Sequence, residues 1–227
     1  FGADAFNARM RADNFSLEEA RQALALCRAF GVKAYITLNT RLTDRQLPQA
    51  AALADALWQA GADAFIVADA GLADVLRRQI PGIELHASTQ MSAHTEYDGA
   101  ALQAAGFSRM VCPRELSYDS LSRLCARSPI PIEMFIHGAH CVSFSGQCLM
   151  SAVMGGRSGN QGSCAQPCRL PIRGRWRRCR RLSAAADLPT DTLQKIIRIC
   201  WVYEPWRTIT AAGSRLMAAE AAVFLWI

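Results

Sequence analysis

The chain has 227 residues, 51% of them hydrophobic, which is enough to bury one sizeable core. It contains no run of 18 apolar residues and begins without the basic and apolar regions of a signal peptide, so the sequence predicts a cytoplasmic protein without a membrane span. The formal net charge of +6 comes from residues 172–227, which hold 10 basic and 4 acidic side chains, whereas residues 1–171 are balanced. The charge is therefore a weak indication that the main part of the chain binds a polyanion.

Helical and strand patterns alternate through the first 137 residues. Apolar side chains recur every three or four positions in some segments, two of which open with a capping box at Ser16 or Thr43. Short runs of aromatic and β-branched residues, typical of strands buried on both faces, separate these segments. The patterns predict helices over residues 16–30, 43–60, 93–105 and 118–127, and strands over residues 34–39, 64–69, 84–88, 110–113 and 132–137.

Alternating strands and helices require parallel strands joined by right-handed crossovers. Five such strands fit either an open doubly wound sheet or an incomplete TIM-like (β/α) barrel. We favour the barrel because polar residues gather at the carboxyl ends of the predicted strands, the face on which barrels build their sites. These residues are Asn39, Asp69, His86, Ser88, Arg114, Glu115 and His137.

Residues 140–171 form a different kind of segment, rich in Gly, Ser, Asn, Gln and Cys and without helical period. A loop of this length is uncommon in a compact domain unless it is functional, so we expect an ordered loop held by something other than a hydrophobic core. Residues 172–227 crowd arginines and tryptophans without a recognisable βα unit, which suggests a shifted reading frame or a foreign ending. The predicted division is a partial βα barrel over residues 1–139, a cysteine-rich loop over 140–171 and an irregular tail over 172–227.

Cysteines concentrate in the predicted loop. Four of the nine follow the spacing Cys141-x6-Cys148-x15-Cys164-x3-Cys168 among glycines. Without an export signal, these thiols are expected to be ligands, nucleophiles or core residues rather than disulfides. Soft thiolates select zinc or iron–sulfur clusters, and the pattern favours a cluster because the last pair alone has the tight spacing usual for zinc. The alternative is a set of buried free thiols.

A buried strand leads directly into the first of these cysteines. Alternation along residues 132–137 places Glu133 and His137 on one side, facing the barrel interior, and Cys141 follows His137 after three residues. Two roles stay open for His137. It forms a nucleophilic pair with the cysteine, or it bonds the backbone at the rim of the barrel as a structural residue.

Another strand end places His86, Ser88 and Gln90 on one face. No acidic residue is evident as the orienting member of a Ser-His-Asp triad, so contact with a substrate is favoured over hydrolysis by a serine. Arg114 and Glu115 close a further strand, and the simplest interpretation pairs them with each other.

The segment from Glu133 to Ser151 resembles a known family signature. The residues Glu133-x-Phe135-x-His137-Gly138-Ala139-x-Cys141-x-Ser143-x-Ser145-Gly146-x-Cys148-x-x-Ser151 are similar to those of the collagenase-type peptidase family U32, whose catalytic mechanism is unassigned. Further matches, in the expected order, are Phe6-Asn7-Ala8-Arg9, Leu38-Asn39-Thr40, His86-Ala87-Ser88-Thr89-Gln90, Arg114-Glu115-Leu116, Gly155 to Asn160, and Cys164 to Arg169. The resemblance covers residues 6–171.

The resemblance implies an iron–sulfur protein more than a protease. The better understood members of the family act in oxygen-independent or prephenate-dependent hydroxylation of transfer-RNA uridine, ribosomal-RNA cytidine or a ubiquinone precursor. They bind a [4Fe-4S] cluster through cysteines of this loop, so the implied ligands are Cys141, Cys148, Cys164 and Cys168. The implied partners are an RNA substrate, tRNA or rRNA, and a related family subunit. The alternatives are cleavage of a peptide substrate and service as a cluster-bearing subunit in ubiquinone biosynthesis.

The candidate site residues follow from the matched motifs. The catalytic candidates are His86, Gln90, Glu133 and His137, and the substrate-binding candidates are Asn39, Ser88, Arg114 and Arg157. The sequence has no His-Glu-x-x-His motif and no nucleophile elbow, which lowers the peptidase interpretation. Family members normally begin with an apolar strand and continue into further strands past the cysteines. The resemblance therefore implies a truncated chain and a barrel that does not close.

Overall fold

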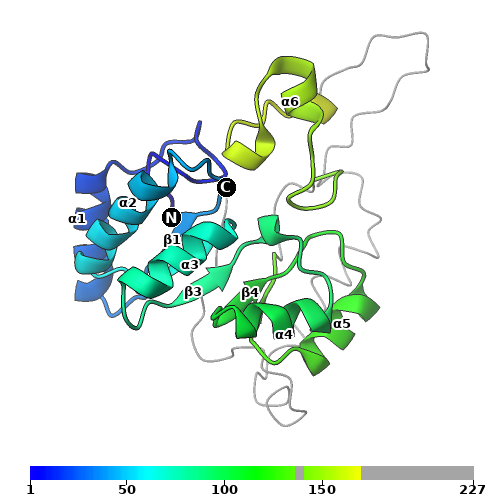
Figure 1. Cartoon of the computed structure of the whole chain (residues 1–227), viewed down its shortest axis with the longest axis horizontal. Coiled ribbons are helices and arrows are strands. Elements are labelled where there is room, and N and C mark those ends of the chain that lie inside the picture. Colours follow the sequence, from blue (N-terminus) through cyan, green and yellow to red (C-terminus); the bar gives the residue numbers. More distant parts are fainter. Residues whose placement is uncertain (136–140, 170–227) are drawn as a thin grey trace.

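Five parallel strands form the centre of the computed structural model, which describes residues 1–135 and 141–169 (Figure 1). The strands lie side by side in the order β1-β2-β3-β4-β5. Their bounds are β1 Tyr35–Leu38, β2 Ala64–Val67, β3 Leu85–Ala87, β4 Arg109–Val111 and β5 Ile132–Glu133. All five predicted strands are therefore confirmed. His137 and the predicted tail over residues 172–227 lie outside the described residues.

Helices form a layer on one face of this sheet (Figure 1). Their bounds are α1 Leu17–Ala29, α2 Leu47–Gln59, α3 Ala70–Gln79, α4 Glu96–Ala104 and α5 Tyr118–Arg127, with a short 3-10 turn η1 at Thr89–Met91. Each helix contributes side chains to a single buried cluster, which also contains Ile36, Phe65 and Met110 from the strands. Because strand side chains alternate between faces, these three residues define the outer face of the sheet.

The strand order decides between the two architectures that the sequence left open. In a doubly wound sheet the order reverses near the middle and helices cover both faces. Here the order is consecutive from β1 to β5 and the helices share one face. Right-handed crossovers that advance in one direction build the wall of a barrel. The fold is thus an incomplete (β/α) barrel, and the sheet does not close on itself within residues 1–135 and 141–169.

Two helices are missing from the sequence prediction. Asp69, which was assigned to a strand end, caps α3 by accepting a hydrogen bond from the Leu72 N–H at 3.0 Å. The buried residues Leu72, Ala73 and Leu76 then repeat at helical spacing. Within the loop predicted to be irregular, α6 (Met150–Gly155) is too short to show a hydrophobic period, and it is followed by the 3-10 turns η2 (Gly159–Gln161) and η3 (Pro167–Arg169).

The inner face of the sheet mixes apolar and charged side chains. Tyr35, Ile66 and Val111 belong to a small inner cluster. His86 and Arg109 alternate with outer-face residues on β3 and β4, and both are buried. No helix in the described part of the chain is both long and apolar enough to cross a lipid bilayer.

Candidate functional site

The cysteine-rich segment, residues 141–169, lies on the carboxyl edge of the sheet. It contacts the loop that follows β1. The Arg41 N–H donates to the Asn160 carbonyl oxygen at 2.8 Å. The Met10 N–H donates to the Gly162 carbonyl oxygen at 3.1 Å. Gly162 has a φ of +78°, and a Cβ there would lie 2.2 Å from the Asn7 carbonyl oxygen, so glycine is needed for this close approach. The second half of the segment is therefore fixed near β1.

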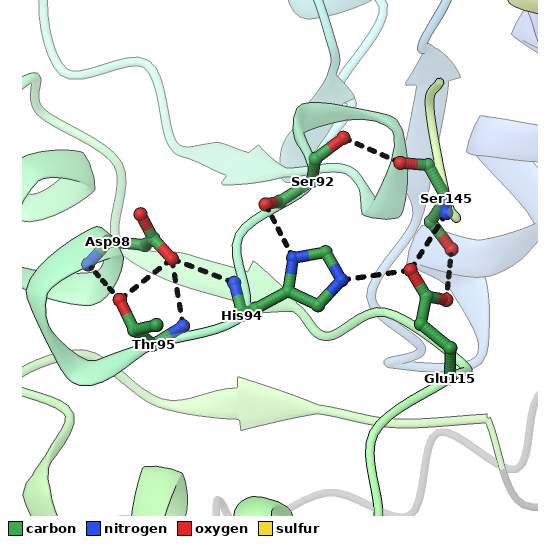
Figure 2. Close-up of polar contacts among 6 residues, drawn as sticks. All are labelled: Ser92, His94, Thr95, Asp98, Glu115 and Ser145. Carbon is green, nitrogen blue, oxygen red and sulfur yellow. Dashed lines mark hydrogen bonds and ion pairs between the residues drawn. The ribbon is translucent and has the colours of Figure 1, made fainter. Parts of the chain in front are cut away.

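Ser145 fixes the first half of the segment to the loops after β3 and β4, as Figure 2 shows. The carboxylate of Glu115 accepts hydrogen bonds from the Ser145 N–H at 2.8 Å and from its hydroxyl at 2.9 Å. The Ser92 hydroxyl donates to the Ser145 carbonyl oxygen at 2.5 Å. Hydrogen bonds to the barrel loops thus hold this part of the segment in place.

His94 completes the polar network around Glu115 (Figure 2). Its Nε2 lies 2.9 Å from Glu115 Oε1, and its Nδ1 lies 2.7 Å from the Ser92 carbonyl oxygen. Both oxygens are acceptors, so each ring nitrogen makes its contact only when it carries a hydrogen. Burial acts to raise the pKa of Glu115, but hydrogen bonds from Ser145 and His94 outweigh it and lower that pKa below its ordinary value.

The sequence does not reveal this network. Its simplest interpretation pairs Glu115 with Arg114, whereas in the structure the Glu115 carboxylate contacts His94 and Ser145. The one local signal for His94 is its position directly before the capping box of α4, where the Thr95 and Asp98 side chains bond each other's backbone. That signal marks the start of a helix, and it does not show which residue lies across the edge of the sheet.

The four cysteines lie on the docked segment. Cys141 and Cys148 are partly exposed, and Cys164 and Cys168 are exposed. Partial burial, and then the Cys141 and Cys164 thiols, raise the pKa of Cys168. The Gln166 N–H points to the Cys164 sulfur at 3.4 Å. In the described ranges no three His, Cys, Asp or Glu side chains are arranged to hold a metal ion. The segment thus offers thiols and a sulfur-directed amide without a preformed cage.

His86, a predicted catalytic residue, is fully buried on the inner face of the sheet. Its Nε2 lies 2.8 Å from Glu84 Oε1, and its ring meets the Tyr35 ring edge-on at 4.8 Å. Burial lowers the pKa of His86 to about 4, although the hydrogen bond to Glu84 opposes this shift. The neutral ring therefore donates its Nε2–H to Glu84, and Nδ1 remains an acceptor with no hydrogen-bond partner among the described residues.

Glu133 also faces the interior, in agreement with the alternation along its strand. Its Oε2 lies 3.4 Å from Arg109 Nη1, and the Arg109 guanidinium lies 5.2 Å from the centre of the Tyr35 ring. Burial raises the pKa of Glu133, and Arg109 opposes that rise. Since Tyr35 contacts both His86 and Arg109, the two catalytic candidates belong to one buried network. The third candidate on this side, His137, lies outside the described residues.

Three residues predicted at the strand ends, Asn39, Ser88 and Gln90, lie close together beside the cysteine-rich segment. Asn39 Nδ2 donates to Ser88 Oγ at 3.3 Å, and the Gln90 N–H donates to the same oxygen at 3.2 Å. Arg41 Nη2 donates to the Gln90 carbonyl oxygen at 3.1 Å. The Ser88 hydroxyl therefore caps η1 and binds Asn39, which is a structural role rather than that of a nucleophile beside a histidine.

The other two substrate-binding candidates lie elsewhere. Arg157 Nε donates to the Ser163 carbonyl oxygen at 3.0 Å, within the cysteine-rich segment itself. The Arg114 guanidinium lies 5.3 Å from the centre of the Phe135 ring. The predicted site thus separates into an inner-face network, a group at the strand ends and a segment that covers that group.

The buried His86 should make stability depend on pH. The unfolded chain protonates this histidine near 6.5, whereas the folded chain does so at about 4. Between these values the unfolded state binds more protons, so stability falls with falling pH by on the order of 3 kcal/mol. We expect His86→Gln, which keeps a donor toward Glu84, to lose this dependence in urea unfolding between about pH 7 and pH 5. Parallel stability curves for the two proteins would contradict this assignment.

The chain is similar in sequence to proteins of a known family. The pattern of peptidase family U32 matches residues 1–191. The chain is 43% identical over 170 residues to the 23S rRNA 5-hydroxycytidine C2501 synthase of Escherichia coli strain K12, which covers 75% of the chain and 25% of that relative. It is 34% identical over 176 residues to the tRNA hydroxylation protein P1 of Bacillus subtilis strain 168, with 74% and 42% covered.

A relative with a different name matches a similar share of the chain. The collagenase of Porphyromonas gingivalis strain ATCC BAA-308 / W83 is 33% identical over 181 residues, with 74% of the chain and 43% of that relative covered. The chain spans a quarter to less than half of the length of these three relatives. Because the family pattern matches residues 1–191, well over half of the 227 residues, the chain belongs to peptidase family U32.

Proposed function

We propose that this chain is part of an iron–sulfur enzyme that hydroxylates a nucleoside base in RNA. The observation that supports it most is the cysteine-rich segment, which is hydrogen-bonded to the loops after β1, β3 and β4. The carboxyl edge is where barrel enzymes assemble their sites. The 43% identity to an enzyme named for 5-hydroxycytidine synthesis in ribosomal RNA supports the same activity. On this proposal the protein acts in the cytoplasm, with tRNA or rRNA as substrate and a related family subunit as partner.

Cys141, Cys148, Cys164 and Cys168 would hold the [4Fe-4S] cluster. Thiolates are the ligands that such clusters use, and hydrogen bonds to their sulfurs tune the reduction potential. The Gln166 N–H already points to the Cys164 sulfur. When bound, the cluster would supply one-electron transfer at the carboxyl edge of the sheet.

The residues of this chain would bind and orient the base. Asn39 and the residues next to Gln90 form a polar surface at the strand ends, close to where the segment docks. Arg41 is exposed, and its guanidinium donates to a neutral carbonyl oxygen, so its positive charge is available to a phosphate of the RNA backbone. The covering segment would exclude water from the base.

The proposal predicts a new hydroxylated nucleoside in cells that make this chain. The full chain would be expressed in bacteria that lack their own rRNA and tRNA hydroxylation proteins, and nucleosides from digested RNA would be examined by mass spectrometry. We expect a pyrimidine nucleoside heavier by one oxygen atom, and its absence from cells with the Cys164→Ser variant. Cluster-loaded protein that leaves the RNA unchanged would overturn the proposal.

Peptide cleavage is the second candidate, because one relative is named a collagenase. The structure gives it less support, since the Ser88 hydroxyl is engaged by Asn39 and the Gln90 N–H. Cleavage of gelatin by the purified chain that persists in Cys164→Ser would favour this candidate over RNA hydroxylation.

A further inference from the structure

Ser145 is bound to the barrel through each of its hydrogen-bonding groups. Its N–H and hydroxyl donate to the two carboxylate oxygens of Glu115, and its carbonyl oxygen accepts from the Ser92 hydroxyl. The residue is 4% exposed, although it lies in a loop between exposed apolar residues. Because the barrel loops supply a hydrogen-bond partner for each of these groups, they fix both the position and the orientation of the Ser145 backbone.

The turn around Ser145 is shaped for this contact. The Gln147 N–H donates to the Phe144 carbonyl oxygen at 3.2 Å, which closes a four-residue turn. Gly146 occupies the third position with a φ of +78°, and a Cβ there would lie 2.2 Å from the Gln90 carbonyl oxygen. The turn therefore packs directly against η1 and cannot shift away from Glu115 without losing this contact.

The turn stands between the first two cysteines of the segment. Cys141 precedes Ser145 by four residues, and Cys148 follows it by three. A chain reaches at most about 3.3 to 3.6 Å per residue, so a fixed Ser145 confines both cysteines to the carboxyl edge of the sheet. The position of the Glu115 carboxylate thus limits where these two sulfurs can lie.

His94 holds the Glu115 carboxylate in place. The ring contacts Glu115 Oε1 through Nε2, and its Nδ1 is anchored on the Ser92 carbonyl oxygen. The side chains of this pair are 23% and 19% exposed, which protects the contact from solvent more than a surface ion pair. Ser92 therefore contacts both ends of the network, through its hydroxyl to Ser145 and through its carbonyl to His94 (Figure 2).

We infer that Glu115 is a positioning residue that clamps the turn between Cys141 and Cys148 onto the carboxyl edge, where these thiols can share a metal centre with Cys164 and Cys168. The suggested role of this contact, which is to position the cluster ligands, rests on the function proposed above. The clamp itself exists in the protein without metal, so it can be tested separately.

The test measures how fast Cys148 reacts with iodoacetamide in the metal-free full chain, by peptide mass spectrometry. Glu115→Gln removes the charge that three donors share, and we expect alkylation of Cys148 to become about tenfold faster, since hydrogen bonds to a charged group are stronger than those to a neutral one. Ser145→Ala, which keeps the N–H donor, should give a smaller increase. Cys27 in α1 serves as the internal reference, and its rate should not change.

Glu96→Gln is the matched control, because the ion pair of Glu96 is with Arg127 and does not involve the segment. It should leave the Cys148 rate unchanged. If Glu115→Gln does not fold, Ser145→Ala decides the question alone. Unchanged alkylation of Cys148 in every variant that folds would overturn the clamp.

Anaerobic reconstitution separates the clamp from the cluster. If both hold, Glu115→Gln binds less iron than the wild type, and the cluster that forms has an altered electron paramagnetic resonance signal. If wild-type protein binds no iron while Cys148 still reacts faster in Glu115→Gln, the cluster proposal fails and the clamp stands.

Discussion

Replacing Cys164 with serine is expected to remove most of the iron that the wild-type chain binds, which should be about four atoms per cluster. The serine hydroxyl is a hard and poorly ionised donor, and an iron–sulfur cluster requires soft thiolates. Cys164 is exposed, and a backbone N–H already points to its sulfur. Iron and acid-labile sulfide per chain would be measured after anaerobic reconstitution, together with the visible absorption of the cluster.

Cys125→Ser is the matched control. Burial raises the pKa of Cys125 to about 11, so this thiol stays protonated at neutral pH and is a poor ligand. The control should bind as much iron as the wild type. Equal iron in the Cys164 and Cys125 variants would contradict the assignment of Cys164 as a ligand.

Gly146→Ala is expected to detach the first half of the cysteine-rich segment. The new methyl group would lie 2.2 Å from the Gln90 carbonyl oxygen, at a φ of +78° that side chains disfavour. The left-handed conformation alone costs roughly 1 to 2 kcal/mol, and the clash with backbone adds to it. We expect the segment to move away from η1, with faster iodoacetamide labelling of Cys148 and loss of iron binding.

Gly156→Ala separates the two causes of this effect. Gly156 has a similar φ of +66°, but a Cβ there would meet nothing within 4 Å. It should therefore show the conformational cost without the clash, and Cys148 should react at close to the wild-type rate. Comparable labelling in both variants would mean that the contact with Gln90 does not hold the segment.

Much of the fold could be predicted because the apolar pattern and the caps are local. The helix predicted over residues 118–127 is α5 with the same bounds, and the Ser16 capping box opens α1. Helix α3 was missed because the apolar strand before it continues into Asp69, which looked like a polar strand end and is the helix cap. A residue type that suits both a cap and a catalytic edge cannot be assigned from the sequence alone.

The candidate site could be predicted as a set of residues but not as a set of contacts. Alternation correctly placed Glu133 in the barrel interior, yet its partner Arg109 depends on the register of β4 against β5. The same limit applies to Ser145 and Glu115, which are 30 residues apart and meet through the docking of a long loop. The cysteines could be proposed as ligands from the sequence because their spacing is a local property.

The cysteine-rich segment bridges strands that are not neighbours. It is hydrogen-bonded on one side to Arg41, after β1, and on the other to Glu115, after β4. Releasing it therefore breaks bonds at both sides of the sheet edge in a single cooperative opening. A molecule that binds the docked segment more tightly than the released segment will therefore slow amide exchange at the ends of both strands. This holds even for a strand end that the molecule does not contact.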